Sequence, residues 1–354
     1  RAGRLMDLPA MGRLPMDRPA TGQGSTTGPG CHALAWTGVG DGMNGGGFGP
    51  LGVALGGGGL RGLAHVGVLR ALQEAGYSPD IVTGTSSGAI LAALWACGWT
   101  PAQMEDVARR LRSAELYDSN LTWGSALAML AQVLGLRWRP RRPVPQGMIQ
   151  GQKLERLVGL WTRGIRLEQL ERPVAIMAAD VRSGRAAVFC PPAYRERVER
   201  AMPGAIVLDK GPLAAAVRAS IAIPGIFEPK RLGPYVLVDG AVKDKVPAEA
   251  ARALGARVVL AVDVSVRQRR EPTGLLDFLG QAFDLMARDL AAFKLERFAD
   301  LVLQPDLPDV ALTDLDRVPE CIEAGARALK EALDDLQRLL HPATGEAASG
   351  EALT

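Results

Sequence analysis

A serine between glycines is the first feature of this sequence that could do chemistry. The pentapeptide at 84–88 reads Gly-Thr-Ser-Ser-Gly and lies between a short apolar run and a run of small and apolar residues. A nucleophilic serine between a strand and a helix needs small neighbours, because the turn is strained and the two elements approach closely. Gly84 and Gly88 meet that need around Ser86, whereas Ser87 lacks glycines at the corresponding positions. The pattern predicts Ser86 as a nucleophile with Gly84 and Gly88 supporting the turn.

A glycine-rich loop, Gly56-Gly57-Gly58-Gly59-Leu60-Arg61-Gly62, lies upstream between another apolar run and a helical pattern. A dinucleotide site would want an acidic residue at the end of the next strand, and Asp80 stands at its beginning instead. A phosphate loop would want Gly-Lys-Ser or Gly-Lys-Thr, which the loop does not contain. An oxyanion hole needs only unencumbered backbone N–H groups at the start of a helix, near the serine turn of the adjacent strand. This last interpretation joins the two motifs in a single site.

A serine nucleophile also needs a base, and the histidines are poorly placed to supply it. His32 and His341 lie in or beside the expected tails, and His65 follows the glycine loop too closely to act as the usual late histidine of a triad. We expect His65 to serve in helix packing or as a hydrogen-bonding support. A carboxylate at the end of a strand is the alternative, and Asp239, followed by Gly240, offers one.

The elements that must position these residues alternate along the chain. Short apolar or β-branched runs predict strands at 51–55, 80–82, 174–179, 235–238, 258–262 and 301–303. Helical patterns follow at 60–76, 89–97, 275–298 and 318–340. In the third of these, apolar spacing predicts a sheet-packing stripe of Leu279, Phe283, Met286, Leu290 and Phe293. Consecutive strand–helix units imply an α/β fold of three layers, α/β/α, with a mainly parallel central sheet.

Three motifs, in this order and context, resemble those of the patatin-like phospholipases, lipid acyl hydrolases with a Ser-Asp dyad. They are residues 57–62, residues 84–88 and Asp239-Gly240-Ala241. Residues 219–227, 179–181 with Gly184, and 299–300 with Pro305 also look like the family, and the likeness covers roughly residues 51–335. Two departures are Ser87, where the family usually has alanine, and Lys243-Asp244-Lys245, where an asparagine is common. They leave the dyad intact and bear on substrate preference and loop geometry.

The resemblance implies that Ser86 attacks an ester carbonyl, that Asp239 accepts the serine proton, and that an acyl-enzyme then hydrolyses. It also implies an oxyanion hole formed by Gly57, Gly58, Gly59, Arg61 and Gly62. Gly240 is expected to permit the turn after Asp239. A carboxylate with an ordinary pKa near 4 is a weak base for a serine, so we expect burial of Asp239 to matter. Neither a cofactor nor a metal is expected.

The expected partner is a lipid or fatty-acyl ester substrate. Nucleic acid is not expected, because a net charge of +3 is too small for an electrostatic footprint. Two other functions remain open from the residues alone. One is a non-catalytic lipid- or acyl-binding module of the same fold, and the other is a nucleotide-binding regulator that uses the glycine loop.

Composition sets the broader bounds. Of 354 residues, 47% are apolar and 22% charged, which excludes a disordered chain. Four scattered cysteines indicate neither a zinc site nor a dense disulfide framework and favour a reducing compartment. No run approaches the ~20 apolar residues of a membrane span. We expect a cytoplasmic location and, in addition, peripheral contact with an anionic membrane.

The residue composition divides the chain into three parts. We expect a disordered extension at 1–50, a catalytic domain at 51–342 with its motifs at 51–250, and a disordered tail at 343–354. Within the domain, an insertion or lid at about 115–148 combines apolar and aromatic residues with Arg137, Arg139, Arg141 and Arg142. That combination suits either a segment packed on the body or an interfacial segment on anionic lipid.

Overall fold

The computed structural model describes residues 49–112, 116, 118, 146–265, 271–272, 274–307, 310 and 314–342. Nearly all of the expected extension at 1–50, the tail at 343–354 and most of the insertion at 115–148 lie outside these residues. Among the described helices, none is both long and apolar enough to cross a bilayer.

One sheet of nine strands forms the centre of the described part of the chain. Seven of them lie side by side in the order β11-β10-β1-β2-β4-β5-β6, and β9 and β8 extend from the edge of β4. The bounds are β1 Leu51–Leu55, β2 Ile81–Thr85, β4 Val174–Asp180, β5 Ala186–Phe189, β6 Ile206–Leu208, β8 Lys230–Leu232, β9 Tyr235–Asp239, β10 Val258–Val262 and β11 Leu301–Leu303. Strands β3 (Gly147–Ile149) and β7 (Gly225–Phe227) pair separately.

The five strands from β11 to β4 are parallel throughout, so the prediction of a mainly parallel sheet is confirmed. Strand β5 is antiparallel to β4, and β9 is antiparallel to both β4 and β8. The predicted strand at 235–238 therefore exists, but it runs against the direction of the parallel strands. Strands β3, β5, β6, β7 and β8 have no counterpart among the predicted strands, and four of them are only three residues long.

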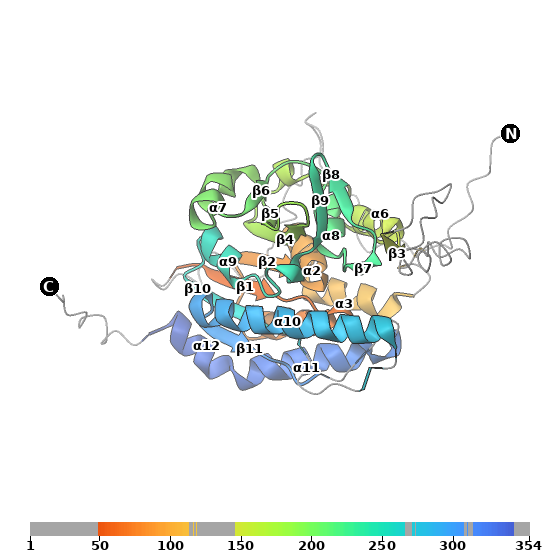
Figure 1. Ribbon diagram of the computed structural model, residues 1–354. Coiled ribbons are helices and arrows are strands. Elements are labelled where there is room, and N and C mark those ends of the chain that lie inside the picture. The colour runs from red at the N-terminus through yellow and green to blue at the C-terminus, as the bar shows by residue number, and fades with distance from the viewer. Residues whose placement is uncertain are drawn as a thin grey trace, which may run out of the picture.

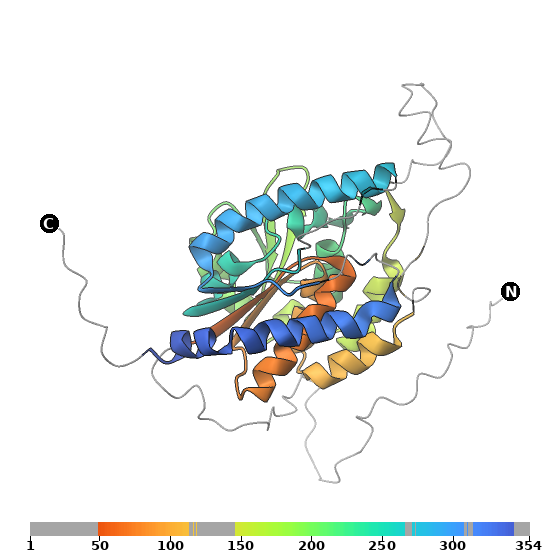
Figure 2. The same ribbon diagram turned by 90° about the horizontal axis from the view of Figure 1, so that it is seen from below.

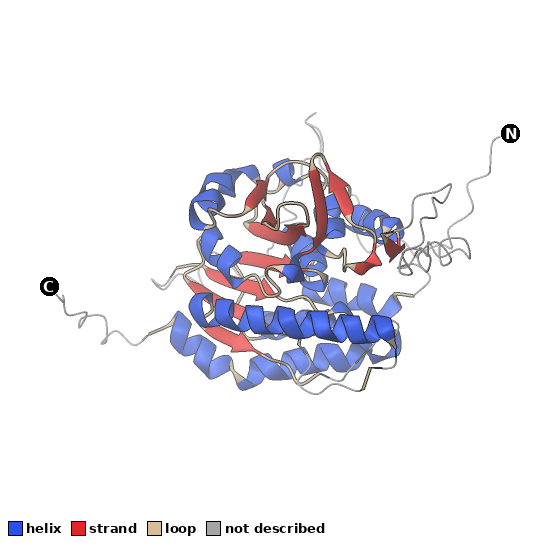
Figure 3. Ribbon diagram, viewed as in Figure 1, coloured by secondary structure: helices blue, strands red, loops and turns tan. Residues whose placement is uncertain are grey.

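Helices cover both faces of the sheet. They are α1 Ala64–Glu74, α2 Ser87–Ala96, α3 Pro101–Arg110, α6 Gln152–Trp161, α7 Arg195–Ala201, α8 Leu213–Ser220, α9 Ala248–Leu254, α10 Leu275–Phe298, α11 Val318–Glu331 and α12 Leu333–Leu340. Figure 1 shows α10 in front of the strands, and Figure 2 shows the strands between α10 on one side and α11 on the other. The helices and strands are distinguished by colour in Figure 3. The three-layer arrangement expected from alternating strands and helices is confirmed.

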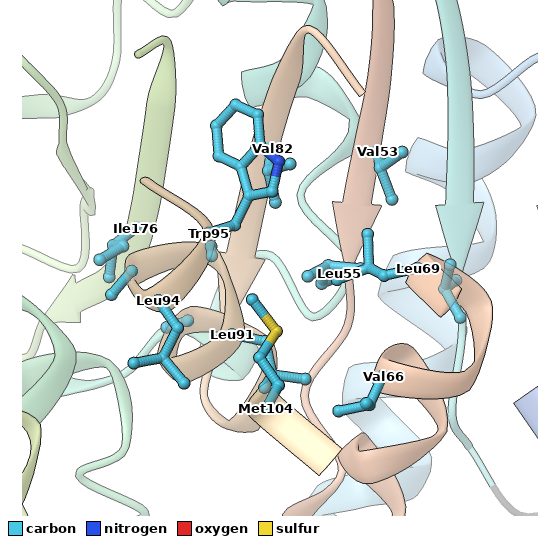
Figure 4. Packing of buried hydrophobic residues seen from close by; sticks show 14 of the residues in the cluster. Val53, Leu55, Val66, Leu69, Val82, Leu91, Leu94, Trp95, Met104 and Ile176 are labelled. Atoms are coloured by element: carbon cyan, nitrogen blue, oxygen red, sulfur yellow. The ribbon is translucent and has the colours of Figure 1, made fainter. Parts of the chain in front are cut away.

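Alternate strand residues enter two apolar clusters, one on each face of the sheet. In β10, Val258, Leu260 and Val262 join one cluster, whereas Val259 and Ala261 join the other. In the first cluster, side chains of β1, β2 and β4 meet those of α1, α2 and α3 (Figure 4). Strands buried on both faces read as continuous apolar runs, which is why the parallel strands were legible in the sequence.

Helices α1 and α11 touch through glycines. A Cβ on Gly67 of α1 would lie 1.8 Å from the Ile322 carbonyl oxygen of α11, and a Cβ on Gly325 would lie 1.9 Å from the Ala64 carbonyl oxygen. Any larger side chain at either position would force the two helices apart. The contact fixes α1, which begins directly after the glycine loop.

Helix α10 presents a different face to the protein from the one that its apolar spacing predicts. Of the five residues in the predicted sheet-packing stripe, only Phe283 is partly buried, and Phe293 is 76% exposed. The helix is buried instead through Ala287, Ala291 and Leu295. It packs against α9 and the short helix η4 (Gly240–Val242), where small side chains allow a close approach. The expectation that the stripe packs on the sheet is wrong.

Candidate active site

The turn at Ser86 joins β2 to α2 and is strained. Ser86 has φ +55° and ψ −118°, a conformation that costs free energy for any residue with a side chain. A Cβ on Gly84 would lie 2.3 Å from the Gly88 carbonyl oxygen, and a Cβ on Gly88 would lie 2.1 Å from the Leu55 carbonyl oxygen. Glycines at 84 and 88 therefore allow the start of α2 to cross directly over β1 and β2.

The backbone of this turn is held from behind by α8. The Ser86 N–H donates a hydrogen bond of 2.8 Å to the Oγ of Ser220, which is fully buried at the end of α8. Two residues further on, the Ala222 carbonyl oxygen accepts a bond of 2.9 Å from the Asp239 N–H. One short segment thus fixes the backbone of both Ser86 and Asp239. The positioning role of Ser220 was missed in the sequence, although the surrounding stretch at 219–227 carried part of the family resemblance.

Strand β4 brings Ser86 and Asp239 together. The last residue of β2, Thr85, pairs with Met177, and the last residue of β9, Asp239, pairs with Ala178. Because β9 runs antiparallel, its end meets the end of β2 along the same edge of β4. A Cβ on Gly240 would lie 2.4 Å from the Met177 carbonyl oxygen, so glycine permits the chain to turn there.

The Asp239 carboxylate is buried, with 2% of the residue exposed. Burial raises the pKa of this carboxyl from 3.8 to about 6. Hydrogen bonds from the Ala241 N–H, at 2.8 Å, and from the Ser86 hydroxyl offset part of that increase, as does the nearby Lys245 ammonium. At neutral pH the carboxylate is therefore ionised and is a stronger base than an exposed aspartate.

The glycine loop lies against Ser86. A Cβ on Gly57 would lie 3.1 Å from the Ser86 Cβ. The Gly57 N–H is already engaged, donating to the Lys245 carbonyl oxygen at 2.9 Å, whereas the Gly58 N–H donates to the Ser87 hydroxyl at 3.1 Å. Gly59, with φ +61°, begins the short helix η1 (Gly59–Leu63). The backbone N–H of Gly57 is thus occupied by Lys245. Gly58 and Gly59 are the other two of the three predicted amide donors.

The other predicted residues of the loop have identifiable contacts. Gly62 makes room for the Ser87 side chain, because a Cβ there would lie 2.2 Å from the Ser87 Oγ. The Arg61 guanidinium lies 3.8 Å from the Asp284 carboxylate of α10. Arg61 thus links the loop to that helix.

His65 supports the loop from beneath. Its Nε2 lies 2.7 Å from the Gly56 carbonyl oxygen, and the side chain is fully buried. Burial lowers the pKa of His65 to about 4, so the ring is neutral at physiological pH and Nε2 donates to the carbonyl. The prediction that His65 packs in a helix and supports hydrogen bonding is confirmed.

A cavity of about 140 Å³ opens beside Ser86. Apart from Ser86 and Ser87, its wall is mostly apolar and includes Leu91, Met104 and Phe227. Such a cavity suits a hydrocarbon chain whose polar end reaches the serine. Among the described residues, no three acidic, histidine or cysteine side chains are grouped so that they could hold a metal ion.

Comparisons with known proteins agree with the motifs. The family model for patatin-like phospholipase matches residues 53–252. An uncharacterized NTE family protein of Mycobacterium tuberculosis is 29% identical over 213 residues, which cover 60% of this chain and 48% of the relative. Patatin-like phospholipase domain-containing protein 6 of Mus musculus is 28% identical over 262 residues, 73% of this chain and 16% of the relative. The chain thus spans about half the length of the mycobacterial relatives and much less of the mouse protein.

Two solved structures are also similar to the chain. The type III effector protein ExoU aligns with a TM-score of 0.42 and 19% identity, covering 81% of this chain and 53% of ExoU. VipD from Legionella pneumophila aligns with a TM-score of 0.40 and 13% identity, covering 80% of this chain and 66% of VipD. Both TM-scores are below 0.5, whereas the family model matches more than half of the chain. The chain belongs to the patatin-like phospholipase family.

Proposed function

We propose that this protein is a serine acyl hydrolase that cleaves carboxylic esters of lipids, as a phospholipase A or a lysophospholipase-like esterase, through the dyad of Ser86 and Asp239. The main support is that the strained Ser86 turn and the buried Asp239 carboxylate meet at consecutive residues of β4, beside an apolar cavity. The cavity takes the acyl chain and places the ester carbonyl next to the Ser86 Oγ.

In the first half-reaction, the Ser86 Oγ attacks the carbonyl carbon and its proton passes to Asp239. The tetrahedral intermediate collapses, the C–O bond to the alcohol breaks, and the leaving alkoxide takes the proton from Asp239. In the second half-reaction, Asp239 accepts a proton from water, and the hydroxide attacks the acyl-enzyme. The fatty acid leaves, and Ser86 recovers its proton from Asp239.

The oxyanion in this scheme is stabilised by amides of the glycine loop, chiefly those of Gly58 and Gly59. The Gly58 N–H donates to the Ser87 hydroxyl, which can rotate away when a stronger acceptor arrives. Gly57, Gly62 and Arg61 shape the loop through their contacts with Ser86, Ser87 and Asp284.

A fluorophosphonate probe with peptide mapping tests the nucleophile. We expect the probe to label Ser86 and leave Ser87 unmodified, and the Ser87→Ala variant to be labelled as before. A chromogenic fatty-acyl ester measures turnover in the same samples. A folded protein without labelling and without turnover would favour the non-catalytic binding module.

The oxyanion hole has its own test with a built-in rescue. A Cβ at Gly58 would lie 2.5 Å from the Val264 Cγ2, so Gly58→Ala should displace the loop. We expect the catalytic constant to fall about tenfold or more, as for other displaced oxyanion donors. Adding Val264→Ala removes the clash, and the Gly58 backbone at φ −176° accepts alanine, so activity should largely return to that of Val264→Ala alone. Unchanged turnover in folded Gly58→Ala would reject the hole.

A further inference from the structure

Helix α10 carries a row of large apolar side chains on the outside of the molecule. We call this row the α10 stripe, and it consists of Phe278, Leu279, Leu285, Met286, Leu290 and Phe293. Phe293 is 76% exposed and Met286 66% exposed. At 3.6 residues per turn the six positions fall within about 140° of the helix circumference and extend over about 22 Å. Figures 1 and 2 both show α10 at the outside of the molecule.

The opposite side of α10 is fastened to the protein by ion pairs. Asp284 lies 2.5 Å from the Lys245 ammonium, and Lys294 lies 3.0 Å from Asp244 and 2.8 Å from Glu249. The Lys245 and Asp244 side chains are almost fully buried. Rotating the helix to bury its stripe would break these pairs and leave buried charges unpaired, which is strongly disfavoured. The outward direction of the stripe is therefore fixed by the fold.

The same ion pairs place the stripe beside the candidate active site. Lys245 follows the Asp239 turn, and its carbonyl oxygen accepts the Gly57 N–H of the glycine loop. Asp284 also lies 3.8 Å from Arg61 in η1. Helix α10 thus contacts both the loop after the base and the loop beside the nucleophile.

Charge and area indicate what covers the stripe. At side-chain areas of about 150–200 Å² for residues of this size, the exposed fractions give an apolar surface of roughly 600 Å². This reaches the upper end for patches on monomers but is smaller than the ~800 Å² that each partner contributes to a standard protein interface. The charged residues beside and within the stripe, Arg288 and Asp289 with Glu296 and Arg297, are balanced in charge; Asp289 falls within the arc of the stripe, and its carboxylate lies 4.0 Å from the Arg288 guanidinium. A near-neutral rim favours an uncharged or zwitterionic surface over a strongly charged one.

We propose that the α10 stripe docks on the surface of a zwitterionic phospholipid assembly and holds the active site against it. The proposal rests on the proposed function, since a lipid ester hydrolase must reach substrate in an aggregate. Helices with one apolar face lie in the interface plane and bury that face at the boundary of headgroups and acyl chains. Docking through residues 278–293 differs from contact through the arginines at 137–142, which would require anionic lipid.

Vesicle binding tests the docking independently of catalysis. In the Ser86→Ala background, co-sedimentation with phosphatidylcholine vesicles is compared for the unchanged stripe and for Met286→Ser with Phe293→Ser. The matched control is Leu160→Ser with Val181→Ser, because these side chains are 71% and 60% exposed on α6 and after β4. We expect the stripe variant to bind about tenfold more weakly or worse, as for the loss of two large apolar side chains from a lipid boundary, and the control to bind normally. Binding should change little with salt, since no net charge is involved.

Activity measurements in protein that retains Ser86 complete the test. The stripe variant should hydrolyse a soluble short-chain ester within twofold of the unchanged protein and lose most of its activity on phosphatidylcholine vesicles. Equal vesicle binding by the two proteins overturns the proposal. A second result would also overturn it: the protein does not bind vesicles, sediments as a dimer, and becomes monomeric when the stripe is mutated. In that case a second copy of the chain covers the stripe. Absence of soluble-ester hydrolysis would refute the proposed function instead, because vesicle binding is measured without it.

Discussion

The buried surroundings of Asp239 disfavour its negative charge. Replacing its carboxylate with an uncharged amide should therefore make the protein less active and more stable. Burial raises its pKa from 3.8 to about 6. A shift of about two pKa units, at 1.36 kcal/mol per unit, corresponds to about 3 kcal/mol of destabilisation by the ionised carboxylate at neutral pH. Asp239→Asn removes that charge, and the amide oxygen can still accept the Ala241 N–H. We expect the variant to unfold with a free energy up to about 3 kcal/mol higher at pH 7.5.

The sign of this effect depends on pH. The folded state holds the Asp239 proton more tightly than the unfolded state, so the destabilisation is absent below about pH 4 and complete above about pH 6. The advantage of Asp239→Asn should therefore grow from near zero at pH 4 to its full value at pH 7.5. His65, with its lowered pKa, opposes stability at acidic pH, but it is present in both proteins and cancels from the difference.

Asp180 offers a control of the opposite sign. It is also buried, and burial alone would raise its pKa, but hydrogen bonds from Ser183 and the Val236 N–H outweigh burial and lower it. Asp180→Asn should therefore lose stability relative to the unchanged protein as pH rises toward about 4 and change little above that, whereas Asp239→Asn gains stability between about pH 4 and pH 6. Urea unfolding followed by circular dichroism at about pH 3, pH 4 and pH 7.5 measures both differences.

Activity gives the second half of the same prediction. Asp239→Asn should reduce turnover about as much as Ser86→Ala, and the double variant should be little worse than either, because residues that act as one unit are strongly non-additive. A folded Asp239→Asn protein with near-normal turnover would refute the dyad. A variant that is no more stable relative to the unchanged protein at pH 7.5 than at pH 4 would refute the raised pKa.

Three further predictions concern the same site and its support. The kcat/KM of the unchanged protein should fall about tenfold for each pH unit below about 6, as Asp239 takes up its proton, and a flat pH profile down to pH 5 would contradict this. Ser220→Ala removes the acceptor of the Ser86 N–H and should lower kcat while leaving KM within about twofold, with a loss of about 1–3 kcal/mol in urea unfolding. Gly67→Ala should destabilise by about 1–3 kcal/mol, because its Cβ would lie 1.8 Å from a carbonyl oxygen of α11, whereas Gly159→Ala, with its nearest atom at 3.8 Å, should be neutral or slightly stabilising.

The parallel strands and the serine turn could be predicted because their causes are local. Buried strands are apolar on both faces, and a tight strand-to-helix turn needs glycines at fixed distances from Ser86. The position of Asp239 at the end of a strand was also legible. The direction of that strand relative to the parallel strands was not, because it is set by the pairing of β9 with the far half of β4. Pairing across such a distance leaves no mark on the residues of either strand.

The remaining features depend on contacts between distant segments. Ser220 supports the Ser86 turn through a single hydrogen bond across the fold, and a buried serine looks the same in a sequence whatever it binds. Helix α10 shows the opposite problem, because its spacing identifies an apolar face without saying which way it points. Its direction is decided by Asp284 and Lys294, whose partners follow Asp239 in the chain.

Strand β4 sets the spacing of the proposed catalytic pair. Thr85 and Asp239 pair with consecutive residues of this strand, so a single peptide unit separates the positions that hold the proposed nucleophile and base. The length of chain between Ser86 and Asp239 then has no influence on that spacing, provided that β4 and β9 keep their register and that Ser220 and Ala222 keep their hydrogen bonds to the two backbones. Segments can be added, removed or exchanged in the interval to suit different substrates while the chemistry stays in place. A scaffold of this kind lends itself to engineering by grafting, in which the residues between α3 and α6 are replaced and the dyad is left untouched.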